Sequence, residues 1–355
     1  MNCFSFMSPK TLPIGLHLGP QSATLVQLSG PPDNLQLYAS AHGDFDLAED
    51  ATPEQQEQEI SAMLQRLVGE HRFKGREVVT CLGSPELFVH NVRLPKLPPE
   101  EVAKAVLWEA EERLPFPLAE AEVRHLLAGE VRQDASTKQE VILLACRNEI
   151  IQRQIQVLER AGLVPVGIDV EPCALLRSLY QGRGGDDCRR AYLHLGARAT
   201  TVVFAEGDQI LFLKYIASGG YHLDTSVSRH LRLPLREAAR MRAVVNAADE
   251  LDKNDEVHRT IIEAIRHPLE ALSAEIELCL RYQKVTFRGR PVEKIVVAGE
   301  EASPWLVHFL EGRLGAPCEM GNPFRGVTHQ VPRTLSDRPG RWATAVGLSL
   351  RSTAV

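Results

Sequence analysis

The tetrapeptide Leu16-His17-Leu18-Gly19 decides the fold, because it returns as Leu193-His194-Leu195-Gly196. The interval is 194 − 17 = 177 residues, half of a chain of 355 residues. The likeness continues downstream, where Thr24 matches Thr201, Val26 matches Val203 and Gly30 matches Gly207. Each copy has the pattern of a short apolar strand, a glycine turn and a second strand. We therefore predict a duplicated α/β fold with a central cleft, in which the two hairpin turns face each other.

The composition is typical of a globular protein, with 44% hydrophobic and 24% charged residues. A length of 355 residues predicts two domains. The net charge of −6 disfavours nucleic acid or an anionic membrane surface as the main partner. The sequence contains no apolar run long enough for a membrane span and no signal-peptide pattern, so we expect a cytoplasmic protein. Seven cysteines without a C-x-x-C pair fit a reducing compartment.

Alternating strands and helices are predicted in the first half. One helix begins at Pro53 after the N-cap residue Thr52. A second opens at Pro98-Pro99, with Leu107 among the residues on its apolar side. A third is predicted to be capped by Asn148 and to end at Gly162.

The stretch 181–187, rich in glycine and charge, is predicted to link the two halves. Beyond it, 191–216 repeats the first hairpin and about 222–285 is rich in helical pattern. The segment 327–341 has the prolines and glycine of a loop, and a final helix is expected from about Trp342.

Several short motifs then follow one another in a fixed order. They are Phe4-Ser5-Phe6, Trp108-Glu109-Ala110-Glu111, Pro115-Phe116-Pro117-Leu118, Ile168-Asp169-Val170-Glu171-Pro172, Gly219-Gly220-Tyr221-His222-Leu223 and Asn322-Pro323-Phe324. Over nearly the whole chain this series resembles the type IV pilus assembly protein M (PilM) family, which is related in fold to the cell-division protein FtsA.

The resemblance implies an actin-like (ribonuclease H-like, duplicated) α/β fold with an FtsA-type inserted subdomain. It also implies the domain limits, which we state as expectations. Domain 1 would span 1–188 (core about 12–85 and 165–188, insertion about 86–164), domain 2 would span 189–335 (helical subdomain about 222–290), and 336–355 would return to domain 1 as a helix.

The resemblance further implies a scaffold of type IV pilus or related secretion machinery. Its partner would be the cytoplasmic N-terminal tail of a single-pass inner-membrane pilus protein (PilN), bound in a groove on the first domain. The protein would then be peripheral to the inner membrane through that partner, without inserting itself, and could assemble into a ring. Trp108 and Phe116 flank a helix end that is a candidate for the groove, although packing in the core of the insertion is the favoured interpretation.

The nucleotide elements depart from those of ATP-using relatives. There an aspartate in the first hairpin holds Mg²⁺, whereas here His17 and His194 occupy the aspartate positions, and imidazole is a poor ligand for Mg²⁺. The third element reads Ala298-Gly299-Glu300-Glu301, with carboxylates that would repel a polyphosphate. The residues of this degenerate nucleotide cleft are His17, Gly19, Ser22, His194, Gly196, Thr200 and Gly299.

We therefore predict a protein that is not an enzyme, with no catalytic residues, no metal site and no cofactor. The two histidines have three interpretations: imidazoles hydrogen-bonded in a closed cleft, which we prefer; protonated imidazoles that bind phosphate; or a transition metal held between them. The alternative function is an ATP-binding actin-like ATPase or small-molecule kinase with unusual metal handling. It would depend on the carboxylates of Asp169, Glu171, Glu300 and Glu301.

Two further groups of charged residues are predicted to be of minor importance. Arg232, Arg236 and Arg240 recur every four residues and are expected on one solvated helix face. Asp169 and Glu171, two residues apart at a strand end, are expected to point to the same side, either into the cleft or as caps of the turn before Pro172.

Overall fold

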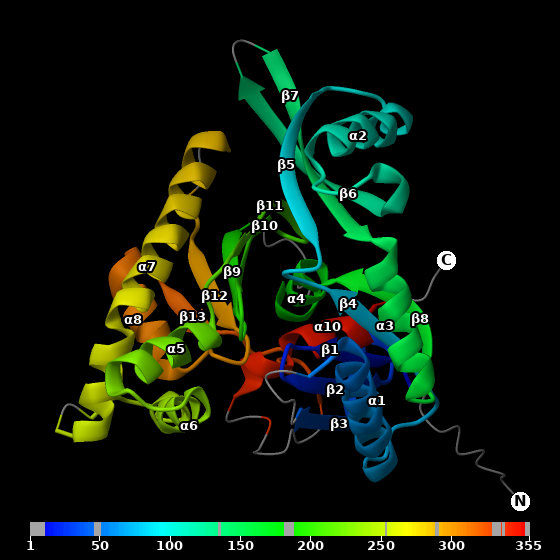
Figure 1. Ribbon diagram of the computed structural model, residues 1–355. Coiled ribbons are helices and arrows are strands. Elements are labelled where there is room, and N and C mark those ends of the chain that lie inside the picture. Colours follow the sequence, from blue (N-terminus) through cyan, green and yellow to red (C-terminus); the bar gives the residue numbers. More distant parts are fainter. Residues whose placement is uncertain are drawn as a thin grey trace, which may run out of the picture.

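The computed structural model describes residues 11–45, 51–133, 136–180, 188–252, 254–287, 291–328, 335 and 338–351. The predicted linker 181–187, the motif Phe4-Ser5-Phe6 and most of the predicted loop 327–341 lie outside these residues. Within them, the chain forms two five-stranded sheets, a three-stranded sheet and the helices that cover them (Figure 1).

The two five-stranded sheets repeat one topology. The first has the order β3-β2-β1-β4-β8, and the second has the order β11-β10-β9-β12-β13. In each, an antiparallel hairpin is extended by parallel strands, since β1 pairs with β2 and β4 as β9 pairs with β10 and β12. The strands are β1 (Ile14–Leu18), β2 (Ser22–Ser29), β3 (Gln36–Asp44), β4 (Glu77–Leu82), β8 (Val164–Val170), β9 (Arg189–Leu195), β10 (Thr200–Glu206), β11 (Gln209–Ile216), β12 (Lys294–Ala298) and β13 (Cys318–Met320). The duplication predicted from the two Leu-His-Leu-Gly motifs is confirmed.

The three-stranded sheet lies, in sequence, between β4 and β8. Its strands are β5 (Phe88–Pro95), β7 (Ser136–Arg147) and β6 (Ala121–Gln133), in the order β5-β7-β6. Helix α2 (Pro99–Arg113) packs on it through Val102, Val106 and Ala110. Leu107 is 42% exposed, so the prediction that it belongs to the apolar side is wrong: one residue beyond Val106 turns its side chain about 100° around the helix. A short 3₁₀ helix, η2 (Leu118–Glu120), leads from α2 into β6.

Helices α1 (Pro53–Glu70) and α3 (Asn148–Arg160) pack against each other on the first sheet. The Thr52–Gln55 capping box at the start of α1 is confirmed, because both reciprocal hydrogen bonds are present. The predicted cap of α3 is wrong, since Asn148 is the first helical residue and Arg147 holds the N-cap position without a side-chain bond. Gly162 follows the helix with φ of 72°, a conformation that favours glycine.

Four helices build the second large core together with the second sheet. They are α5 (Gly220–Leu231), α6 (Leu235–Asn246), α7 (Glu256–Thr286) and α8 (Pro304–Leu314). Arg232 is not part of α6: it ends α5 with φ of 56°, so the predicted arginine face of Arg232, Arg236 and Arg240 is wrong as a set. Arg236 and Arg240 lie on α6, and both side chains are exposed.

The centre of the molecule contains α4 (Glu171–Tyr180), the 3₁₀ helix η3 (Pro339–Trp342) and α10 (Ala343–Ser349), between the two large sheets (Figure 1). Side chains from α4 and both sheets form one hydrophobic cluster that includes Leu175, Tyr192 and Val203. The final helix returns to the first sheet, where the Ser349 hydroxyl accepts from Leu28 N–H and donates to the carbonyl of Pro13. Glycines allow this close approach, because a Cβ at Gly15 or Gly347 would collide with the backbone carbonyl of Ala345 or Ala174.

We expect Gly347→Ala to lower the free energy of unfolding by about 1–3 kcal/mol, because the added methyl group overpacks the contact with α4. The matched control is Gly312→Ala on α8, where an added Cβ meets nothing within 4 Å. This change should stabilise the protein by up to about 1 kcal/mol through helix propensity. Urea unfolding measures both, and equal effects of the two changes would contradict the central role of the α4–α10 contact.

Candidate functional site

The two hairpins meet where the sequence predicted a cleft. The ring centroids of His17 and His194 are 5.5 Å apart, with the rings edge to face. Both histidines hold the same register position, since His17 lies opposite Thr24 and His194 opposite Thr201. The structure therefore brings the two copies of the repeat together at one point between the large sheets.

The turn of the first hairpin holds a carboxylate of the protein itself. Gly19 N–H donates to the carbonyl of Ser22 and closes the turn. The Ser22 hydroxyl donates to Glu300 Oε1 over 2.7 Å, and the same oxygen lies 3.3 Å from the point where a Gly19 Cβ would stand. Gly299, with φ of 105°, brings Glu300 there, because a side chain at 299 would strike the backbone of Leu195. A carboxylate of the chain therefore lies beside the turn of the first hairpin, hydrogen-bonded to the Ser22 hydroxyl.

The turn of the second hairpin is hydrogen-bonded to the backbone at the start of α5. The carbonyls of Gly196 and Ala197 accept from the N–H groups of Gly220 and Tyr221, in the first turn of α5. The hydroxyl of Thr200 donates to the carbonyl of Ser218. These helix N–H groups are the ones that would otherwise be available to an anion. At this turn the protein satisfies them with its own carbonyl groups.

A buried ion pair fixes the helical part of the second half to the same loop. Arg242 on α6 is 7% exposed and donates to both carboxylate oxygens of Glu301 and to Asp224 on α5. The amide of Asn246 also donates to Glu301. Burial alone would lower the pKa of Arg242, but the two carboxylates outweigh it and raise the pKa above its ordinary value. Glu301 thus serves to anchor α5 and α6.

His194 is paired with Glu171 across the centre of the molecule. The distance from His194 Nδ1 to Glu171 Oε1 is 2.5 Å, and the Thr201 hydroxyl donates to the same carboxylate. Burial opposes both charges, yet each partner favours the charged form of the other. As a result the pKa of His194 is raised and that of Glu171 is lowered.

His17 differs from His194. Its Nδ1 is buried and has no hydrogen-bond partner among the residues that the structure describes, and His194 Nε2 likewise has none there. The preferred interpretation, two hydrogen-bonded imidazoles, therefore fits His194 but is wrong for His17 Nδ1. Burial and the neighbouring His194 lower the pKa of His17, which favours its neutral form. Within the described ranges, no group of three or more histidine, cysteine or carboxylate side chains is arranged to hold a metal ion.

Asp169 and Glu171 do not point to the same side. Asp169 pairs with Arg177 over 2.9 Å and accepts from Val170 N–H. Glu171 is the first residue of α4, so the alternation expected of a strand ends before it. Of these two carboxylates, only that of Glu171 faces the cleft.

Sequence reasoning missed Arg242, Asp224 and Asn246. A signal for Arg242 was present, because it stands four residues after Ala238 and three before Val245, within the buried stripe of α6. A charged residue in such a stripe requires a buried partner. The partner itself, Glu301, lies 59 residues away in sequence.

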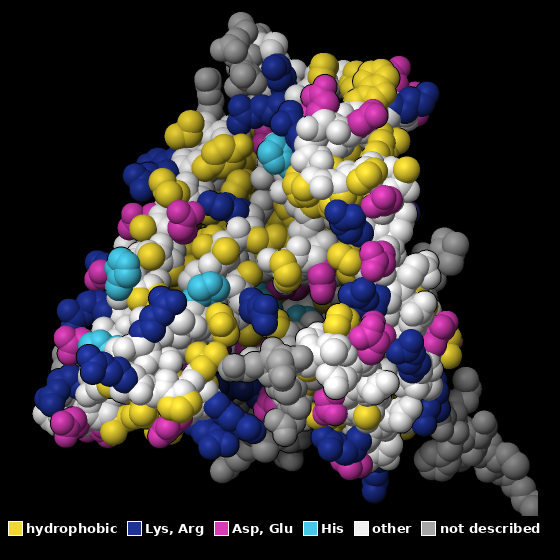
Figure 2. Space-filling view, in the orientation of Figure 1, with side chains coloured by type: hydrophobic (Ala, Val, Ile, Leu, Met, Phe, Trp, Pro, Cys, Tyr) yellow, Lys and Arg dark blue, Asp and Glu magenta, His cyan; other side chains and the backbone are white. Residues whose placement is uncertain are grey.

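Helix α2 lies far from the cleft and carries an exposed aromatic side chain, Trp108. Trp108 is 73% exposed, so the favoured interpretation, packing in the core of the insertion, is wrong for this residue. Phe116 is half-buried, and the guanidinium of Arg147 lies 4.6 Å from its ring centroid. Figure 2 shows apolar side chains exposed over α2, with acidic and basic groups around them.

The family described as "Type IV pilus assembly protein PilM" matches residues 15–353. The chain belongs to this family. Its fold is actin-like, as the resemblance implied.

Two solved structures illustrate the relation. A chain of the "PilM-PilN type IV pilus biogenesis complex" is 26% identical, with a TM-score of 0.80, over 97% of this chain and 99% of that one. The ethanolamine utilization protein EutJ from Carboxydothermus hydrogenoformans is 14% identical, with a TM-score of 0.58, over 98% and 91% of the two chains. The second likeness concerns the fold alone. Among the residues described in this PilM family member, no helix has the length and apolar character needed to cross a membrane.

The His194–Glu171 pair gives a pH-dependent prediction. Because the pKa of His194 is raised in the folded chain, the pair stabilises the fold fully below the ordinary histidine pKa of 6.5, and this contribution is lost as the pH rises through the raised value. Because the pKa of Glu171 is lowered, its carboxylate stays charged in the pair until the pH falls through that lowered value. We expect the difference in free energy of unfolding between wild type and His194→Gln to be larger at about pH 6 than at about pH 9, by on the order of 1 kcal/mol.

Chemical denaturation at each pH measures this difference. The control is Gly312→Ala on α8, which neither adds nor removes a titratable group, so its difference from wild type should not change with pH. A pH-independent difference for His194→Gln would show that the pair is not charged in the folded protein.

Proposed function

We propose that this protein is an actin-like adaptor of type IV pilus assembly that binds the cytoplasmic tail of a PilN-like inner-membrane protein and does not hydrolyse ATP. The absence of ATP hydrolysis is supported by the Glu300 carboxylate, which accepts a hydrogen bond from the Ser22 hydroxyl in the turn of the first hairpin. The role in pilus assembly and the PilN-like partner are supported by family membership and by the similarity to a chain of the PilM–PilN complex.

The electrostatics of the cleft argue against a nucleotide. Glu171 and Glu300 contact residues of the two hairpins and Glu301 follows Glu300 in the chain; of the three, Glu171 and Glu301 already have buried cationic partners, His194 and Arg242. A phosphate entering beside Glu300 would meet a like charge, and unit charges 4 Å apart near a protein surface interact by roughly 4 kcal/mol. His17 and His194 add no carboxylate for Mg²⁺. Nucleotide binding would thus first require Glu300 to leave the turn.

Helix α2 has the character of a docking surface. Beside the exposed Trp108, the sequence 99–113 contains five glutamates and two basic residues, a net charge of 2 − 5 = −3. Exposed aromatic side chains are enriched at protein interfaces, and an acidic rim suits a tail with basic residues close to the membrane surface. The protein would be held at the cytoplasmic face of the inner membrane by this contact.

The absence of nucleotide binding is tested by calorimetric titration with ATP and Mg²⁺. We expect no heat of binding from the wild type, because the turn is occupied, and the same protein sample should still give heat with the tail peptide. Micromolar binding of ATP that disappears in His17→Ala would overturn the proposal. It would favour the alternative function, an actin-like ATPase or small-molecule kinase with unusual metal handling.

The docking surface is tested by a peptide that corresponds to the cytoplasmic tail of the PilN-like protein. We expect Trp108→Ala to weaken binding at least about tenfold, because truncating a central aromatic side chain removes much of the binding energy of an interface. The matched control is Tyr38→Ala, which removes a 40% exposed aromatic side chain from β3 in the first sheet. If Trp108→Ala binds like the wild type, α2 is not the surface; if no variant binds the peptide, the partner is wrong.

A further inference from the structure

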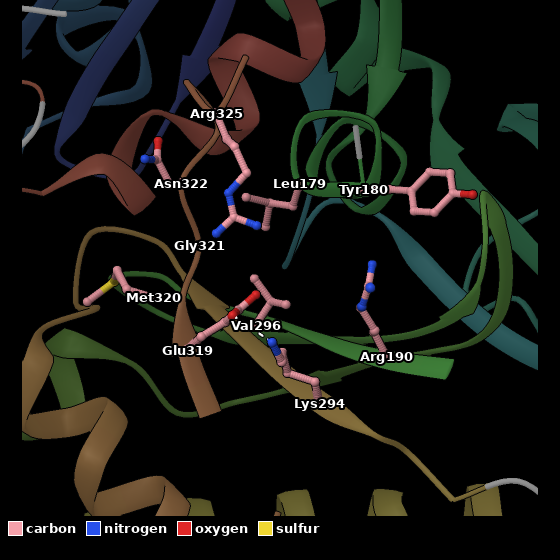
Figure 3. Close-up of a pocket in the computed structure, with 10 residues that line it drawn as sticks. All are labelled: Leu179, Tyr180, Arg190, Lys294, Val296, Glu319, Met320, Gly321, Asn322 and Arg325. Carbon is pink, nitrogen blue, oxygen red and sulfur yellow. Dashed lines mark hydrogen bonds and ion pairs between the residues drawn. The ribbon is translucent and has the colours of Figure 1, made fainter. Parts of the chain in front are cut away.

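The cavity in Figure 3 lies between the end of α4, strands β9, β12 and β13, and the segment after β13, with a volume of about 160 Å³. Its basic side chains are largely engaged within the chain, since Lys294 forms a 2.9 Å ion pair with Glu319 and Arg190 also interacts with another group. The polar lining of this cavity is therefore mostly satisfied. By contrast, α7 exposes an apolar surface to solvent.

Helix α7 carries a stripe of apolar side chains on the face that points away from its own core. Its buried residues, among them Leu272 and Ile276, pack in the core that the helix shares with the second sheet. At 100° per residue, apolar residues that recur every three or four positions lie on one side of a helix. The exposed residues with this spacing, which we call the α7 seam, are Ala271, Ala274, Leu278, Tyr282 and Val285. Figure 2 shows apolar side chains exposed along the upper half of α7, with charged groups beside them.

The seam has the character of a helix-packing surface. Val285 is 77% exposed and Leu278 is 50% exposed. A single exposed apolar residue is ordinary on a protein surface, whereas a stripe about four turns long is typical of a helix that packs against another helix. The small side chains of Ala271 and Ala274 would let the backbone of a second helix approach closely at one end.

Contacts with two sheets hold the upper part of the seam in one orientation. The Tyr282 hydroxyl donates to the buried Glu140 over 3.2 Å and accepts from Arg93 over 3.3 Å, and both partners belong to the inserted sheet. The ring centroid of Tyr282 lies 5.2 Å from that of Phe212 on β11. The seam is thus ordered before anything docks on it, which lowers the entropic cost of association.

We propose that the α7 seam pairs with the same seam of a second copy of this chain, with the two helices antiparallel. A two-fold axis that passes between residues 279 and 280 sets Ala274 of each copy opposite Val285 of the other. Leu278 of each copy then lies within about one residue, or 1.5 Å along the helix, of the level of Tyr282 of the other. Smaller side chains thus face larger ones, so the seam is complementary to itself in size.

The charges beside the seam are complementary to themselves in the same arrangement. Glu277 and Arg281 lie one turn apart on one flank of the seam, and their ion pair within the helix is long, 3.9 Å, with both side chains well exposed. In the antiparallel pair this flank faces the same flank of the second copy, which brings each Glu277 to within about one residue of the level of Arg281 of the other copy. A helix with unrelated charges would not match both patterns, and this match identifies the occupant as a second copy.

Such a contact closes at two copies, so by itself it does not build the ring that the resemblance implied. The seam is short, and we expect weak association with a Kd on the order of 10 µM. Helix α2 is not part of the seam. The inference is therefore independent of the surface proposed for the PilN-like tail.

Sedimentation equilibrium of the full chain, over a concentration range that brackets this Kd, measures the association. We expect Leu278→Arg to weaken it at least about tenfold, because a charge would enter the apolar contact. Glu277→Lys and Arg281→Glu should each weaken it, since each sets like charges opposite one another. An equimolar mixture of these two charge variants should associate like the wild type, because every flank then faces its opposite charge.

The matched control is Arg266→Glu, the same charge change at an exposed position of α7 before the seam, which should leave association unchanged. A wild type that stays monomeric at every concentration would overturn the proposal and leave the seam to a helix of a different protein. Equal behaviour of Arg281→Glu and Arg266→Glu, or no gain on mixing the charge variants, would also overturn it. Because mixing predicts recovery between two weakened proteins, a folding defect cannot imitate the expected result.

Discussion

A negative charge supplied by the chain itself sets the arrangement of the central cleft. The carboxylate of Glu300 accepts a hydrogen bond from the Ser22 hydroxyl in the turn of the first hairpin. The carboxylate of Glu171 pairs with His194 and accepts a hydrogen bond from Thr201 in the second hairpin. Both contacts join a residue of one half of the chain to a residue of the other. Moving the halves apart would break both contacts, and a small shift that kept the groups buried would leave Glu171 and His194 unpaired, which is costly. The separation of the two hairpins is thus fixed by side-chain chemistry.

The repeat could be predicted because strand pattern and glycine turns are local features. The same is true of the Thr52–Gln55 capping box, which lies within four residues. The errors arose where a residue's role depends on distant parts of the chain or on a helix boundary. Glu171 starts a helix instead of continuing a strand, and Trp108 faces solvent because α2 has only a narrow buried stripe.

Other features required strand register. Arg190 and Lys294 are 104 residues apart in sequence (294 − 190 = 104), and only the pairing of β9 with β12 makes them neighbours. Glu301 and Arg242 are likewise distant in sequence, and only the packing of α6 against the loop after β12 makes them neighbours. A single sequence contains the residue types for such contacts but not their pairing. The candidate cleft was therefore predictable in position, whereas its internal ion pairs were not.

The glycines that bring α10 onto the first sheet and the carboxylates of the cleft belong to one connected set of contacts at the centre. Gly340 accepts from Gly299 N–H, so the segment before α10 also supports the loop that carries Glu300. By contrast, α2 and its exposed Trp108 lie on the inserted sheet, away from this centre (Figure 1). A partner docking on α2, as proposed, would not have to disturb the buried contacts, so recognition and internal stability would depend on different parts of the chain.

A ligand that is part of the chain differs from a nucleotide in one lasting respect. Glu300 is tethered a few residues from the strand that delivers it, so it cannot be diluted, exchanged or consumed. In the proposed adaptor no step would be timed by nucleotide hydrolysis, because Glu300 is held by a hydrogen bond and no covalent bond breaks when it moves. Within the proposed adaptor, timing would come from the order in which partners arrive, and disassembly would have to be driven from outside.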